Sequence, residues 1–209
     1  MRPPLIPVLL VALGTTSCFG LGGSPPEIHR HSIGLFEIEK VCEEPVFPSI
    51  AVRNFEGRQR YEARVLVIDE SDGTLSYYEN ERWLEDPRDA LTDVVREGLA
   101  ISGAFEVVGP VTSGFIADYI LDGTVLECDV IKTTSGPWRA RLALRLDAAR
   151  VENSEMLNAA VYRAERDLPA ADVHGVGRAM TACAKEITEN AGRDWLESAP
   201  PENRIDTPR

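Results

Sequence analysis

The sequence is poor in the residues and motifs that mark most enzymes. It contains three histidines and four cysteines in 209 residues, and no two cysteines form the CxxC motif of thiol–disulfide enzymes. It also lacks a phosphate-binding loop, a GxSxG nucleophile elbow and an HExxH zinc motif. We therefore expect no catalytic residues, no metal site and no cofactor, and we interpret the chain as a non-enzyme. A hydrolase whose carboxylates converge from distant positions is the least favoured alternative.

The histidine pair His29 and His31 is the only feature that suggests metal binding. Both residues follow a stretch rich in glycine and proline, residues 20–26. Two imidazoles at this spacing need further ligands from elsewhere in the chain to hold a metal ion. We interpret them as exposed linker histidines.

Lysine is scarce as well, since it occurs only at Lys40, Lys132 and Lys185 and the other basic residues are arginines, and the 22 basic residues are outnumbered by 34 acidic ones. The formal net charge is −12 at pH 7, and such a surface repels the phosphates of nucleic acids and anionic lipids. We expect neither to be an electrostatic partner. Apolar residues make up 44% and charged residues 27% of the chain, which is typical of a folded globular protein.

No apolar run reaches the roughly 20 residues that a membrane-spanning helix requires. The longest, residues 5–14, follows a positively charged start and precedes three small residues and Cys18. This order is typical of a secretory signal, and it resembles the lipobox of bacterial lipoproteins. The resemblance implies that Cys18 is acylated, with palmitate among its chains, and that these chains anchor the protein firmly. A secreted protein with a chance cysteine is the alternative.

The residue after the cysteine, Phe19, favours sorting to the outer membrane, since an aspartate there would resemble the signal for inner-membrane retention. We predict a lipid-anchored protein that faces the periplasm. Once Cys18 is acylated, an odd number of cysteines remains, so at most one internal disulfide can form. Whether it forms is left open for Cys42, Cys128 and Cys183.

Composition divides the chain into four parts. We predict a signal peptide over residues 1–17, an acylated cysteine with a flexible tether over 18–45, one domain over 46–197 and a polar tail over 198–209. Glycine and proline in the tether are typical of a linker. A short strand is predicted at its later part, residues 33–38.

Apolar periodicity within the domain predicts two helices and a series of strands. Asp86, Pro87 and Gly103 mark the start and end of the first helix, and an apolar stripe predicts the second over residues 170–196. Asp72-Gly73 predicts a hairpin turn. The pattern predicts a two-layer α+β domain, with a mostly antiparallel sheet and both amphipathic helices on one face. The predicted strands are residues 50–55, 64–69, 74–78, 105–108, 118–131, 138–151 and 157–166.

The stretch over residues 61–103 is the most distinctive part of the sequence. It has a paired tyrosine, Tyr77-Tyr78, an Arg82-Trp83 pair and a proline-started helix that ends at Ser102-Gly103. Together with residues 117–123, these motifs resemble the ABC-type transport auxiliary lipoproteins of the PqiC/YmbA type. The resemblance implies a non-enzymatic outer-membrane adaptor of an intermembrane lipid transport system. Its partner would be an MCE-domain protein and, through it, an ABC permease and ATPase.

The candidate partner interface is the cluster Tyr77, Tyr78, Arg82 and Trp83, because Tyr, Trp and Arg are enriched at interface hot spots. The alternative interpretation is that Trp83 and one tyrosine pack under the first helix while Arg82 pairs locally. A homo-oligomer built through the edge of the 64–78 hairpin is a further hypothesis, since sheet edges must be covered or blunted. The alternative function is an outer-membrane lipoprotein that activates a peptidoglycan synthase or assembles a secretion pore.

Overall fold

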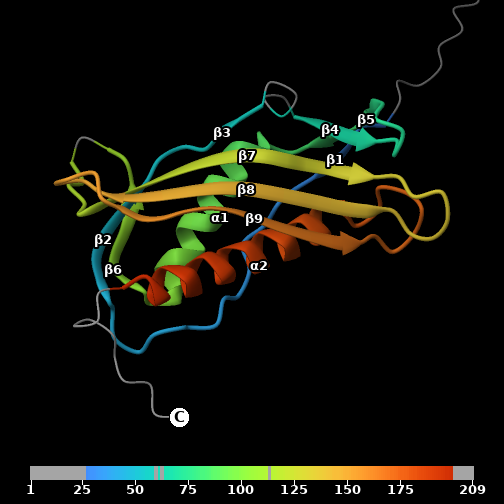
Figure 1. Ribbon diagram of the computed structural model, residues 1–209. Helices are drawn as coiled ribbons and strands as arrows, with labels where there is room; N and C mark the ends of the chain where they lie inside the picture. Colours follow the sequence, from blue (N-terminus) through green and yellow to red (C-terminus); the bar gives the residue numbers. More distant parts are fainter. Residues whose placement is uncertain (1–26, 59–60, 62–63, 113, 200–209) are drawn as a thin grey trace, which may run out of the picture.

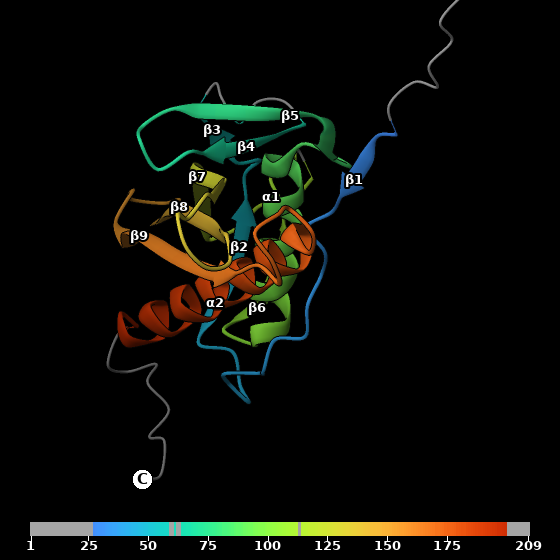
Figure 2. The same ribbon diagram turned by 90° about the vertical axis from the view of Figure 1, so that its right-hand side faces the viewer.

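The computed structural model describes residues 27–58, 61, 64–112 and 114–199, and it confirms the predicted α+β class. Two helices cover one face of an open, mixed sheet of nine strands (Figure 1 and Figure 2). In chain order the elements are β1 (His29–His31), β2 (Phe47–Val52), β3 (Glu56–Gly57), β4 (Val65–Asp69), β5 (Leu75–Trp83), α1 (Pro87–Ser102), β6 (Phe105–Pro110), β7 (Tyr119–Ile131), β8 (Arg139–Arg150), β9 (Met156–Asp167) and α2 (Val176–Glu197).

The centre of the sheet is the long strand β7. On one edge it pairs with β8 in an antiparallel register, and β8 pairs in the same way with β9. On its other edge, three short strands pair with it in parallel, one after another: β2 at its start, then β3, then β4 at its end. These three strands thus lie one after another along β7, from its start to its end.

The first helix begins and ends where the sequence predicts. The Asp86 carboxylate accepts a hydrogen bond from the backbone N–H of Arg88, which caps α1, and Pro87 is its first residue. Gly103 ends the helix with a φ of 75°, a conformation that glycine adopts without strain. A side chain there would also clash, because a Cβ on Gly103 would lie 2.6 Å from the carbonyl oxygen of Cys42.

The second helix starts later than predicted, at Val176 instead of residue 170. Gly175 has a φ of 82°, which is incompatible with helix, and the carboxylate of Asp172 accepts a hydrogen bond from the backbone N–H of His174. These local turns occupy the residues that the apolar stripe had assigned to the helix.

The core lies between the helices and the inner face of the sheet. The alternation predicted for β8 is confirmed, since its five inward side chains are fully buried. At one end of the core, the ring of Phe105 lies 5.0 Å from Phe47 and 6.0 Å from Trp195 of α2, measured between centroids. These contacts join β2, β6 and α2. The inward residues of β8 are Ala140, Leu142, Leu144, Leu146 and Ala148.

Residues 27–45, which the sequence assigns to a flexible tether, pack against the domain; we call them the strap. Its strand, β1, pairs in parallel with β5, and Ile33 and Ile38 are buried. The strand predicted at residues 33–38 is wrong, because the only strand of the strap is His29–His31.

The strap is held by contacts that are distant in sequence. The backbone N–H of Gly34 donates to Thr181 of α2, and the backbone N–H of Val41 donates to the carbonyl of Ser102 at the end of α1. Gly98 leaves room for Ile38, whose Cδ1 would lie 2.5 Å from a Cβ at that position. In the part of the chain that the structure describes, neither helix is long and apolar enough to cross a membrane.

Candidate partner interface

The four candidate interface residues all lie on or at the end of β5, but the structure separates them. Tyr77 and Arg82 are exposed, with half of the Tyr77 surface open to solvent. Tyr78 is half-buried and Trp83 is buried. Only Tyr77 and Arg82 therefore present their side chains on the surface.

An irregular register between β4 and β5 causes this separation. Val67 pairs with Tyr77, whereas Val65 pairs with Arg82. The segment of β5 between these two pairs therefore contains more residues than the segment of β4 opposite it. Extra residues on one strand make a bulge, which redirects side chains and breaks their alternation. The Tyr77-Tyr78 pair and the Arg82-Trp83 pair consequently do not share one face of the sheet.

Tyr78 packs against Trp138, just before β8, and this contact covers part of its ring. Its ring is nearly parallel to that of Trp138, at 11° and 6.4 Å between centroids, and the Lys132 ammonium lies 5.8 Å and 5.1 Å from the two ring centres. The ammonium is also 2.8 Å from Glu70 Oε1. This hydrogen bond raises the pKa of Lys132 and lowers that of Glu70, so both groups are charged at neutral pH. The cluster ties the β4–β5 hairpin to the adjacent end of β7 and β8.

Trp83 and Glu81 hold the strap in place. The ring of His31 meets that of Trp83 edge-on, with centroids 6.3 Å apart. His29 Nδ1 is 3.0 Å from one oxygen of the Glu81 carboxylate, and His31 Nε2 is 2.6 Å from the other. The histidines that the sequence suggested were exposed linker residues are thus bonded to one side chain of β5.

A buried polar cluster on the outer face of the sheet was not predicted. Asp129 of β7 is 1% exposed, and it accepts hydrogen bonds from the Tyr61 hydroxyl at 2.8 Å and from Arg141 of β8. Arg141 also donates to Asp69 of β4 at 2.9 Å. Alternation along β8 predicted that Arg141 faces solvent, and no sequence pattern indicated that Asp129, its cross-strand neighbour on β7, is buried. The cluster joins β4, β7 and β8 and is structural.

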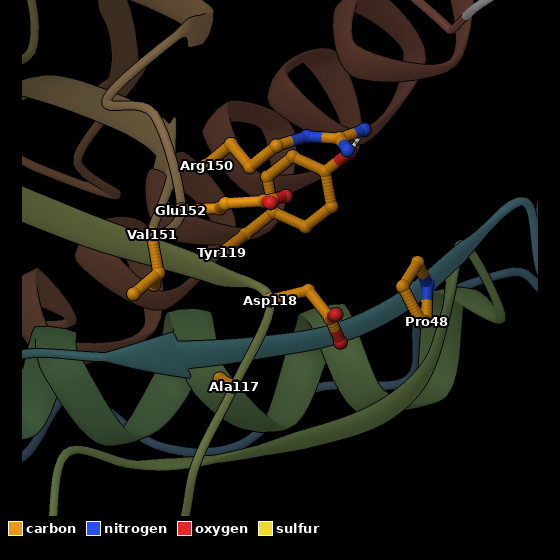
Figure 3. Close-up of a pocket in the computed structure, with 7 residues that line it drawn as sticks. All are labelled: Pro48, Ala117, Asp118, Tyr119, Arg150, Val151 and Glu152. Atoms are coloured by element: carbon orange, nitrogen blue, oxygen red, sulfur yellow. Dashed lines mark hydrogen bonds between the residues drawn. The ribbon is translucent and has the colours of Figure 1, made fainter.

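A small hollow of about 210 Å³ lies where β7 begins and β8 ends (Figure 3). Its wall is the Tyr119 ring, over which Arg150 lies with its Cζ 5.4 Å from the ring centre and its Nη2 3.0 Å from the hydroxyl. This hydrogen bond raises the pKa of Arg150. Asp118, on the rim, accepts from the Ser49 hydroxyl, and its own backbone N–H donates to that oxygen. The sequence offered no motif for this hollow.

The described residues contain no arrangement suited to nucleophilic or metal-assisted chemistry. The three described cysteines are free thiols, and burial raises the pKa of each of them, that of Cys183 to about 12. Thiols with raised pKa values are poor nucleophiles. Within the same residues no group of three His, Cys, Asp or Glu side chains is placed to hold a metal ion. Cys18, the predicted lipidation site, lies outside the described residues.

Comparison with known families places this arrangement. The family model described as "ABC-type transport auxiliary lipoprotein component" matches residues 45–189. A search of curated proteins finds no significant match.

Solved structures share the fold at low sequence identity. A crystal structure of a protein from Xanthomonas campestris matches with a TM-score of 0.70 and 15% identity, over 85% of this chain and 99% of that one. An uncharacterised protein matches with a TM-score of 0.61 and 12% identity, over 81% and 99% of the two chains. A hypothetical protein from Chlamydia trachomatis matches with a TM-score of 0.51 and 10% identity, over 71% and 98%.

Proposed function

This chain belongs to the family of ABC-type transport auxiliary lipoprotein components, and we propose that it is a non-enzymatic adaptor of an ABC/MCE-type intermembrane lipid transport system. The observation that carries the proposal is the family match, which spans residues 45–189 and hence both helices almost completely. The partner is an MCE-domain protein and, through it, an ABC permease and ATPase.

The proposed anchor is the outer membrane, through acyl chains on Cys18. The strap begins at Glu27, so the chain between the anchor and the packed domain spans at most about 30 Å at roughly 3.3–3.6 Å per residue. A tether that ran to residue 45 would reach about three times as far. The packed strap therefore keeps the domain close to the membrane surface.

The proposed contact surface on β5 consists of Tyr77 and Arg82. Both side chains are exposed, and within the described part of the chain the Arg82 side chain makes one long hydrogen bond, from Nη2 to the Glu79 carbonyl at 3.3 Å. Exposed Tyr and Arg side chains lose little on reorienting toward a partner and are frequent hot spots. Tyr78 and Trp83 support this surface from beneath, through the Lys132 cluster and the strap.

Co-purification with the MCE-domain protein tests the adaptor function. We expect the mature lipidated protein to co-purify with it from detergent-solubilised membranes, and a photo-crosslinking residue at Tyr77 or Arg82 to form an adduct with it. The control is a crosslinker at Arg193, an exposed arginine of α2. If the wild-type protein does not associate with the MCE-domain protein, the adaptor function is wrong. If it associates but only the Arg193 position crosslinks, the surface on β5 is wrong.

Two further measurements test the remaining parts of the proposal. We expect no ATPase activity from the purified protein; turnover that a single substitution abolishes would contradict a non-enzymatic role. For the homo-oligomer, the edge of β5 beyond the three residues paired with β1 is the proposed contact between copies. A single monomeric mass in light scattering, even with the MCE-domain protein present, would exclude it.

A further inference from the structure

The end of the sheet where β7 begins carries the most exposed large apolar side chain among the described residues. Ile116, in the loop before β7, is 94% exposed, and Val151 and Met156, which flank the β8–β9 turn, are 50% and 51% exposed. The backbone N–H of Val151 donates to the carbonyl of Asp118 at 2.8 Å, which joins the loop to the turn. We call this end the tip and define it by Ile116, Ala117, Asp118 and residues 150–156.

Two apolar residues of the tip, Ala117 and Val151, line the hollow of Figure 3, together with the charged Asp118 and Glu152. Pro48, Tyr119 and Arg150 line it as well. Met156 lines a neighbouring hollow of about 120 Å³ that shares the Tyr119–Arg150 wall. Exposed apolar side chains gathered at one end of a domain mark contact sites, and Ile116, Val151 and Met156 form such a group beside the hollow. The stacked Arg150 and Tyr119 make its wall rigid before any ligand binds.

The charge of the tip selects the occupant. Asp118, Glu152 and Glu155 are exposed, whereas Arg150 is already bonded to the Tyr119 hydroxyl. Carboxylates therefore outnumber the positively charged groups around the exposed apolar side chains of the tip. A ligand that combines an apolar side chain with an adjacent positive charge is complementary to both features, whereas an anionic membrane surface is repelled.

The position of the tip relative to the anchor indicates where that ligand comes from. Figure 1 shows the strap entering the fold beside β5, in the right half of the view, while the tip is at the left end of β7 and β8. The short reach from Cys18 to Glu27 keeps the β1 end near the membrane. The tip is thus at the end of the sheet opposite the side where the strap enters, within reach of a partner that approaches across the periplasm.

We infer that the tip binds a segment of the MCE-domain partner in which an apolar side chain stands next to a lysine or arginine. The inference rests on the proposed function and adds a second contact to the surface on β5. The apolar side chain packs against the exposed Ile116 and Val151 beside the hollow, and the basic side chain pairs with Glu152 or Asp118.

Binding of the purified MCE-domain protein to mature lipidated protein in detergent tests the inference. The variants are Ile116→Ser with Val151→Ser, and separately Glu152→Lys; all three side chains are exposed, so the fold is preserved. We expect the double variant to bind about tenfold more weakly, as loss of interface anchors does. Glu152→Lys should weaken binding most at low salt, where charge pairing is least screened. The control is Leu35→Ser, because Leu35 is 67% exposed on the strap and its loss should leave affinity unchanged.

The outcomes separate this inference from the proposed function. If the wild type binds and the tip variants bind equally well, the inference is wrong and the adaptor function stands. If the wild type does not bind, both fall. If the double variant loses self-association in light scattering, or loses adsorption to phosphatidylglycerol vesicles, while keeping its affinity for the MCE-domain protein, the tip contacts a second copy or a membrane and the inference is wrong.

Discussion

Arg141 of β8 and Asp129 of β7 form a two-point ion pair on the outer face of the sheet. Nε lies 2.9 Å from Oδ1 and Nη2 lies 3.1 Å from Oδ2. Desolvation by itself would lower the pKa of Arg141, but hydrogen bonds and the charge of Asp129 outweigh it and raise that pKa. Arg141 Nη2 is also 2.9 Å from Asp69, and Glu127 is 3.9 Å from its Nε. One guanidinium therefore forms ion pairs with three carboxylates.

Loss of Arg141 should be the costliest single change on the outer face. In Arg141→Leu, the buried Asp129 carboxyl loses its counter-ion, and breaking a buried pair in this way costs about 3 kcal/mol. Urea unfolding measures the loss. The matched control is Arg145→Leu, on the same strand and face, because the side chain of Arg145 is 55% exposed in its pair with Asp147 and should contribute under about 0.5 kcal/mol. Equal losses in the two variants would show that the cluster has no special role.

A glycine in the middle of β7 makes room for an aromatic ring. A Cβ on Gly123 would lie 2.2 Å from Cδ1 and Cε1 of Phe55, so Gly123→Ala must displace that ring and should cost about 1–3 kcal/mol. The control is Gly192→Ala in α2, where a Cβ meets no atom within 4 Å and alanine should stabilise the helix by up to about 1 kcal/mol. The free energy of unfolding of the two variants should change in opposite directions. Partial rescue of Gly123→Ala by Phe55→Leu would confirm that the ring is the cause.

The parts of the fold that the sequence predicted depend on local signals. The cap at Asp86, the proline after it and the glycine at 103 act within one turn of α1, and the alternation of β8 repeats along a single strand. Such features need no knowledge of distant residues. The α+β class follows from them directly.

The strap and the split of the candidate interface depend on contacts that no local pattern encodes. Ile33 and Ile38 belong to a short apolar run that predicts a strand, but they are buried by packing against α1 and α2, which are distant in sequence. Tyr77 and Tyr78 are adjacent in sequence, yet the bulge opposite β4 and the position of Trp138 decide which one is exposed. No sequence pattern predicted the tip, because exposed apolar residues in loops do not recur at the spacing of a helix or a strand.

The cap of α1 should give stability that depends on pH. Hydrogen bonds from the Arg88 side chain, and then from its backbone N–H, hold the pKa of Asp86 below its ordinary value despite partial burial. A depressed pKa contributes stability above the unfolded value of about 3.9 and loses it as the pH falls through the folded pKa. Asp86→Ala should therefore cost about 1 kcal/mol at pH 7 and progressively less below about pH 4. Unfolding of wild type and variant at pH 7 and pH 3 measures the difference.

The control for the cap is Asp89→Ala, in the first turn of the same helix. Asp89 contributes negative charge there but does not cap, so its removal should cost only a few tenths of a kcal/mol. A penalty for Asp86→Ala that stays constant between pH 7 and pH 3 would contradict a charged cap.

The free thiols should differ in reactivity. Cys128 and Cys183 are buried, and burial raises the pKa of both, whereas Cys42 is partly exposed. We expect iodoacetamide at pH 8 to modify Cys42 alone in the folded Cys18→Ser protein and all three thiols in guanidinium, as measured by intact mass. Adding Cys42→Ser should abolish labelling of the folded protein. Rapid modification of Cys128 or Cys183 without denaturant would mean that the core between β7 and α2 opens.

Membrane attachment should depend on Cys18 alone. Neither helix of the described residues could cross a bilayer, and the net charge of −12 opposes adsorption to anionic headgroups. On the proposed lipidation of Cys18, two or three acyl chains supply the affinity for the membrane. We expect Cys18→Ser to move the protein from the membrane fraction to the soluble periplasmic fraction, with its thermal unfolding unchanged because the strap still packs from Glu27 onward. The control is Cys42→Ser, which should remain in the membrane fraction. Membrane fractionation that Cys18→Ser leaves unaltered would disprove lipidation at this residue and, with it, the short tether between the anchor and the strap.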